Sequence, residues 1–64
     1  MSNAAYIREA SDILLKAMLG SNALVQKWWN SPNAAFANKT PNAIFEIDPN
    51  AVYRYLTTHM EGNW

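Results

Sequence analysis

His59 is the only histidine in the chain and therefore the first candidate for general acid–base catalysis. A general base needs an orienting partner and a nearby nucleophile or bound substrate. Tyr55 and Glu61 are close to it in sequence, but neither forms a recognised catalytic constellation with His59. The amphipathic pattern of the last segment instead predicts that His59 lies on the inner or partner-facing side of a helix.

The acidic residues and the glycines give no stronger sign of catalysis. Glu46 and Asp48 are two positions apart, so their carboxylates point to different sides of a helix. Asp48 is better explained as an N-cap before Pro49. Two glycines are too few for a glycine-rich phosphate loop, and one histidine without any cysteine argues against a zinc site. We expect a non-enzymatic protein without catalytic residues, metal or cofactor, although so small a chain could contribute a residue to a shared site.

The size of the chain limits how it can be stabilised. Its 64 residues, 1–64, suffice for one small domain, which buries only about 60% of the surface of its unfolded chain. Without cysteine there is no disulfide, so a core of large side chains or a partner must supply the stability. Half of the residues are apolar, and three tryptophans, three tyrosines and two phenylalanines are present, which suits both solutions.

Charge and hydropathy exclude two classes of partner. Five basic and five acidic residues give a net charge of zero, and the basic ones are scattered along the chain. Direct nucleic-acid binding is therefore not expected, since phosphate contacts need clustered lysine or arginine. No apolar run approaches the roughly 20 residues of a membrane span, and no signal peptide is recognisable. We expect a cytoplasmic protein, with which the absence of cysteine is compatible.

The first half of the chain predicts two helices. Apolar residues at a spacing of three and four predict a helix over 4–19, with Gly20 as a left-handed stop. The residues of this apolar pattern are Ile7, Ala10, Leu14, Ala17 and Met18. A second helix is expected from a cap at Ser21 or Asn22 to Trp29 or Asn30. The following proline ends it, because the residue before a proline avoids the helical region.

The second half contains two further helix starts. Asn38 lies in a turn and could adopt a positive φ. Thr40-Pro41 and Asp48-Pro49 each combine a capping side chain with proline at the first helical position. The last helix has an apolar face and ends at Gly62; the face comprises Val52, Tyr55 or Leu56, His59 and Met60. The fold class predicted for the chain is all-α, a compact bundle of four to five short helices.

The tryptophans are the most informative residues for binding. Trp28 and Trp29 point about 100° apart on a helix, so both can hardly enter one small core equally. In one interpretation one is core and the other an interface anchor at the edge of the fold; in the other both are core. Trp64 follows Gly62-Asn63, and it either folds back onto the last helix or reaches a partner.

The segment from Trp28 to Pro41 carries a family resemblance. A tryptophan pair, a Pro-Asn turn, a large apolar residue and a Thr-Pro helix start follow one another at the positions Trp28, Trp29, Pro32, Asn33, Phe36, Thr40 and Pro41. This pattern resembles the toxin-binding domain of the Xre/MbcA/ParS-type antitoxins, and Val52, Leu56 and Gly62 match the family's last helix. Asn38 stands where the family usually has glycine, and Thr58-His59 where it tends to have arginine and an aliphatic residue.

The resemblance implies a function. It covers about residues 22–62 and leaves room for only one preceding helix, so the chain looks like a free-standing toxin-binding domain without the family's helix-turn-helix. Such a domain is expected to inhibit a RES-type, NAD-consuming toxin by occluding its active site with its C-terminal end. The residues expected to contact the partner are Trp28, Trp29, Tyr55, His59, Met60, Gly62, Asn63 and Trp64.

Two alternatives to the antitoxin hypothesis stay open. A phage or mobile-element protein could reuse the same fold to inhibit or trigger a host defence system. A homo-oligomeric structural module is the other alternative, because an apolar face at Trp28 or Trp29 would suit a homodimer and a domain this small would gain stability from one. A tight complex with a neighbouring gene's toxic product would separate the antitoxin hypothesis from both.

Overall fold

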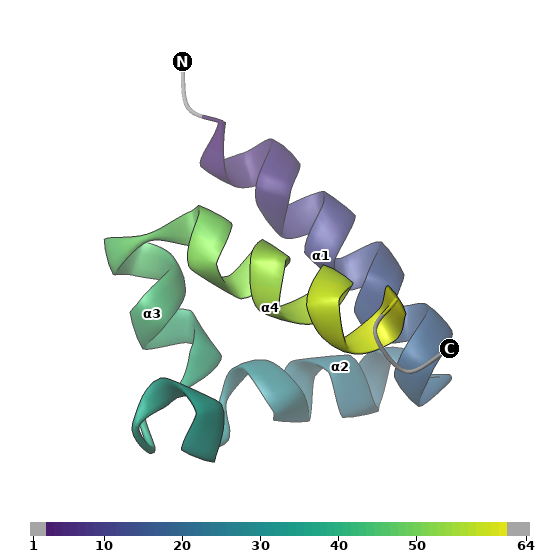
Figure 1. Cartoon of the computed structure of the whole chain (residues 1–64). Coiled ribbons are helices and arrows are strands. Elements are labelled where there is room, and N and C mark those ends of the chain that lie inside the picture. The colour runs from purple at the N-terminus through teal and green to yellow at the C-terminus, as the bar shows by residue number, and fades with distance from the viewer. Residues whose placement is uncertain (1–2, 62–64) are drawn as a thin grey trace.

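The computed structural model describes residues 3–61, with only the backbone described for Met60 and Glu61. The described part is an all-α bundle, as the sequence predicts (Figure 1). Its elements are α1 (Ala4–Leu19), α2 (Asn22–Trp29), the 3-10 turn η1 (Ala34–Phe36), α3 (Pro41–Ile47) and α4 (Pro49–Glu61). Helix α4 packs against α1 and α3, and α2 packs against α1 and α3 from below in the view of Figure 1. None of the helices described is long and apolar enough to cross a membrane.

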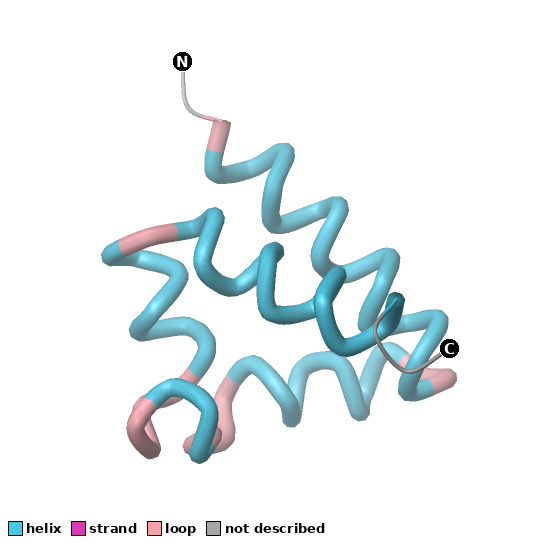
Figure 2. The backbone as a smooth tube through the Cα atoms, in the orientation of Figure 1, coloured by secondary structure: helices cyan, strands magenta, loops and turns pink. Residues whose placement is uncertain are grey.

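Local signals set the helix ends, so the short connections of Figure 2 follow from the sequence. Gly20 adopts φ 88° and donates its N–H to the Lys16 carbonyl, which ends α1. Ser21 caps α2 by accepting a hydrogen bond from the Leu24 N–H, and Thr40 caps α3 by accepting one from Ala43. Pro41 occupies the first turn of α3, where its missing N–H costs nothing.

The start of α4 differs in one detail from the prediction. Asp48 precedes Pro49, but no hydrogen bond within the described residues joins its carboxylate to the first turn of α4. Its backbone carbonyl accepts the Ala51 N–H instead, at 3.0 Å. Asp48 therefore marks the boundary between α3 and α4 through its backbone, and its side chain does not act as the predicted cap.

Five apolar side chains from three helices form the fully enclosed core. These are Leu15 of α1, Val25 and Trp29 of α2, and Val52 and Leu56 of α4. The half-buried side chains of Leu14, Leu19, Trp28, Phe36, Ile44, Phe45 and Tyr55 surround it. The core thus combines one tryptophan with aliphatic residues, which is how so short a chain fills its interior.

The inward face of α1 is shifted from the predicted one. Ser11 and Leu15 are its fully buried residues, whereas Ala17 and Met18 are exposed. Ser11 is tolerated inside because its hydroxyl donates to the Ile7 carbonyl at 2.8 Å. The prediction used the spacing of apolar residues, and a serine at the centre of the buried face does not belong to such a pattern. This is why the predicted inward face of α1 was shifted.

Candidate functional site

Four aromatic rings from three elements lie together at the surface, and we call them the aromatic face. It consists of Trp28 at the end of α2, Phe36 of η1, and Tyr55 and His59 of α4. The Phe36 and Tyr55 ring centroids are 5.0 Å apart, and those of Tyr55 and His59 are 4.1 Å apart. Trp28 stacks near Tyr55 at 6.4 Å with an interplanar angle of 24°. The face is therefore a continuous aromatic surface built by residues far apart in sequence.

The two adjacent tryptophans take opposite roles. Trp29 is fully buried, and Trp28 is half-buried at the edge of the core. Their rings meet edge to face with centroids 5.2 Å apart, so the core tryptophan supports the surface one. The unequal burial of the two rings, one in the core and one at its edge, is confirmed, and the role of Trp28 as an interface anchor stays a prediction. Trp29 has no exposed surface, and so its assignment to the residues that contact a partner is corrected.

The loop between α2 and α3 positions Phe36. Asn33 accepts backbone N–H bonds from Phe36 and Asn38 at 2.9 and 3.0 Å, and its own N–H donates to the Lys39 carbonyl. The Asn33 side chain also accepts from the Ala35 N–H. Two successive residues, Ala37 and Asn38, have positive φ and turn the chain back toward α3. The positive φ expected at Asn38 is confirmed, and the dense hydrogen bonding fixes Phe36 against Tyr55.

Helix α4 supplies the other half of the aromatic face. Tyr55 and His59 are four residues apart and therefore lie on the same side of the helix. Tyr55 is half-buried against the core, and His59 is exposed. Val52 and Leu56 point into the core, so α4 divides its surface between interior and face. The structure thus brings together three of the residues predicted to contact a partner: Trp28, Tyr55 and His59.

The other predicted contact residues fall at or beyond the end of the described chain. Gly62, Asn63 and Trp64 lie outside the described residues, and for Met60 only the backbone, in α4, is described. Their part in binding stays a prediction.

A polar network holds Trp29 in place. The indole Nε1–H donates to Asp12 Oδ1 at 2.7 Å, and the Arg8 guanidinium lies over the indole ring at 3.8 Å. Arg8 Nε lies 3.7 Å from the same carboxylate oxygen, and Arg8 Nη1 donates to Asn42 Oδ1. This network satisfies the buried indole N–H and tethers α1 to α2 and α3.

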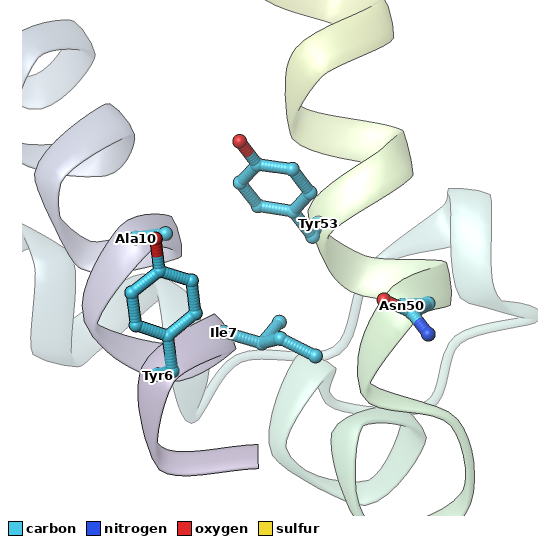
Figure 3. A pocket seen from close by; sticks show the side chains of 5 residues that line it. All are labelled: Tyr6, Ile7, Ala10, Asn50 and Tyr53. Carbon is cyan, nitrogen blue, oxygen red and sulfur yellow. The ribbon is translucent and has the colours of Figure 1, made fainter. Parts of the chain in front are cut away.

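A second surface feature lies between α1 and α4. A cavity of about 180 Å³ opens there, and its lining comprises Tyr6, Ile7 and Ala10 of α1 with Asn50 and Tyr53 of α4. Figure 3 shows the rings of Tyr6 and Tyr53 standing on opposite sides of it. Tyr6 is 76% exposed, so its side chain packs little against the rest of the fold although it forms one side of the cavity.

Sequence reasoning missed Phe36 as a site residue and missed the cavity. Phe36 was recognised only as a matched apolar position, although a large ring in a turn flanked by two helix caps is a usable sign of a docked side chain. The cavity has no comparable signal, because it depends on how α4 lies against α1. Nothing in the local sequence of either helix reports that packing.

In chemical terms the aromatic face offers stacking surface and polar edges. Among the described residues, no three His, Cys, Asp or Glu side chains gather in a way that could hold a metal ion.

No family model, curated protein or solved structure matches the chain. The resemblance to the antitoxin domains therefore stays a prediction, and the functional argument rests on the residues themselves.

Proposed function

We propose that this chain is a non-catalytic protein-binding module that neutralises a RES-type, NAD-consuming toxin by occluding its active site. The observation that supports the proposal is the aromatic face of Trp28, Phe36, Tyr55 and His59. The resemblance over residues 22–62 adds the class of partner, and the face adds a surface on which that partner could dock.

The aromatic face has the physical properties of a binding hot spot. Tryptophan and tyrosine are enriched among residues that contribute most to protein association, because they offer large apolar area with a polar edge. Here Trp28 and Tyr55 are already held by ring contacts to Trp29 and Phe36. Little side-chain freedom is left to lose on binding, which favours affinity.

The position of the face agrees with occlusion by the C-terminal end. Tyr55 and His59 lie in the last two turns of α4 before the chain reaches Gly62. A toxin that docks on these rings meets the end of the helix at the same time. We propose that residues 60–64 extend the contact into the toxin's cleft, with Trp64 as anchor.

The test takes the product of the gene next to this chain's gene, which the proposal expects to be a RES-type toxin, and measures whether the chain inhibits its NAD consumption. We expect the purified chain to abolish NAD consumption at a stoichiometric ratio and to form a stable complex. His59→Ala and a chain ending at Gly62 should each weaken inhibition by about tenfold or more. Ile47→Ala is the matched control, because Ile47 is a large apolar side chain that is 77% exposed on α3, a helix that contributes no ring to the face.

Two results would contradict the proposal. Full NAD consumption in an excess of folded chain would exclude toxin neutralisation. Unchanged inhibition by both His59→Ala and the truncated chain would show that the aromatic face and the C-terminal end are not the contact. Circular dichroism of each variant separates a lost contact from a lost fold.

A further inference from the structure

Helix α1 has a second apolar stripe on the side that faces away from the core. We call Tyr6, Ala10, Ile13 and Ala17 the outer stripe; their spacing is four, three and four residues. Tyr6 is 76% and Ile13 65% exposed, and Ala17 is exposed as well. On a helix of 3.6 residues per turn, Ile13 points almost opposite to the buried Ser11 and Leu15. Helix α1 is thus apolar on two sides: one packs into the core, and the other is exposed except where Tyr6 and Ala10 border the cavity with α4.

The spacing of the outer stripe is that of a helix–helix seam. Apolar residues that repeat four and three apart form the line along which two helices interlock side chains. Small and large residues alternate here, alanine at 10 and 17 and a large side chain at 6 and 13. Placed antiparallel on a second α1, Ile13 of one copy falls beside Ala10 of the other, and Tyr6 beside Ala17. Each large side chain meets a small one, so the stripe complements itself.

The charges beside the stripe select the same arrangement. Glu9 and Lys16 are exposed and seven residues apart, so they flank the stripe on one edge. In the antiparallel pair Glu9 lies beside Lys16 of the second copy, and the two-fold symmetry forms this ion pair twice. In a parallel pair Glu9 faces Leu14 of the second copy instead and has no ionic partner. Charge complementarity therefore favours the antiparallel pair.

We propose that the outer stripe of α1 is the interface of an antiparallel homodimer. The cavity between α1 and α4 fits this arrangement, because Ala10 lines it (Figure 3). In the antiparallel pair, Ile13 of the second copy lies beside Ala10. Tyr6 and Tyr53 then close around that isoleucine from both sides. The interface lies on α1 and not on the aromatic face, so the dimer goes beyond the proposed function and leaves that surface open.

The size of the seam sets the expected strength. A helix of 16 residues is about 24 Å long at 1.5 Å per residue, which limits the contact to four interlocking layers. Stable complexes usually bury about 800 Å² on each partner, and one short helix seam buries less. We expect an equilibrium between monomer and dimer that shifts with protein concentration.

The test is sedimentation equilibrium of the full chain over a wide concentration range, with charge-reversed variants. E9K gives this edge two lysines and K16E gives it two glutamates, so each variant alone should dimerise roughly tenfold more weakly. An equimolar mixture of E9K and K16E should dimerise again, because each lysine then meets a glutamate. Glu46→Lys and Lys27→Glu are the matched controls, with the same charge changes at exposed sites on α3 and α2.

Ile13→Lys should abolish the dimer without loss of helix content, since Ile13 is 65% exposed and is not part of the core cluster. A chain that stays monomeric at millimolar concentration would overturn the proposal. So would a dimer that persists in Ile13→Lys, or one that is equally strong in E9K, K16E and their mixture. The experiment contains no toxin, so its failure would not affect the proposed function.

Discussion

Trp29 shows how single residues connect the interior of this protein to its surface. Its ring is fully buried, its N–H donates to Asp12, and Arg8 covers its face. Its ring also meets that of Trp28, the tryptophan of the aromatic face, edge to face. One buried side chain therefore orders both a polar network and the candidate binding surface.

The bond between Trp29 and Asp12 gives a prediction at this scale. Asp12→Ala removes the acceptor of a buried indole N–H, so we expect the free energy of unfolding to fall by about 1–2 kcal/mol. Asp12→Asn retains an acceptor oxygen and should lose less. Urea unfolding followed by tryptophan fluorescence measures both. The control is Glu46→Ala, an exposed carboxylate on α3; an equal loss there would show that the bond contributes nothing specific.

Helices and turns form the next scale, and among the described residues the turn after η1 holds two non-glycine residues with positive φ. Ala37 adopts φ 58°, a left-handed conformation that costs a residue with a Cβ about 1–2 kcal/mol. Ala37→Gly removes this strain from the folded state. Glycine also raises the conformational entropy of the unfolded chain, which offsets part of the gain in stability. We expect the free energy of unfolding to rise by about 0.5 kcal/mol in thermal or urea unfolding. A marked loss of stability would contradict the strain; Ala23→Gly, within α2, should lose stability as the control.

The helix starts give a second prediction at the scale of elements. Thr40 caps α3 through its hydroxyl, so Thr40→Ala should lower the free energy of unfolding by about 1 kcal/mol. Asp48 bonds to the first turn of α4 through its backbone carbonyl, so Asp48→Ala should cost clearly less. Urea unfolding of the two variants in parallel is the measurement. Equal losses would mean that the Asp48 carboxylate caps α4 in solution.

The helix boundaries could be predicted because their signals are local. Gly20, Ser21 and Thr40-Pro41 each stop or start a helix through bonds to residues within four positions. The inward face of α1 could not, because it is centred on Ser11, whose burial depends on its own bond to the Ile7 carbonyl and on packing between helices. The same holds for the aromatic face, where Phe36 meets Tyr55 across 19 positions of sequence. Local interactions therefore allow the helix boundaries to be predicted. Packing between distant segments determines which side chains are buried and which rings meet, and the sequence pattern does not predict it.

At the scale of the whole molecule, this chain of 64 residues has aromatic side chains in three kinds of place: the core, the aromatic face and the outer side of α1. Trp29 fills the core, Trp28 and Tyr55 build the aromatic face, and Tyr6 stands on the outer side of α1. The aromatic face is built by α2, η1 and α4, whereas the proposed dimer surface is built by α1 together with Tyr53 of α4. One partner could therefore dock on the aromatic face while α1 pairs with a second copy.

The most direct test of the account is a map of the residues that the toxin touches. Saturation transferred from the unlabelled RES-type toxin to the deuterated, ¹⁵N-labelled chain reports contact residue by residue. We predict the largest signal loss at the Trp28 indole and at the amides of Phe36, Tyr55 and His59, with little loss at the buried Trp29 indole or at Ile47. Losses confined to α1 or to Ile47, or no loss at all, would contradict the claim that the aromatic face binds the toxin.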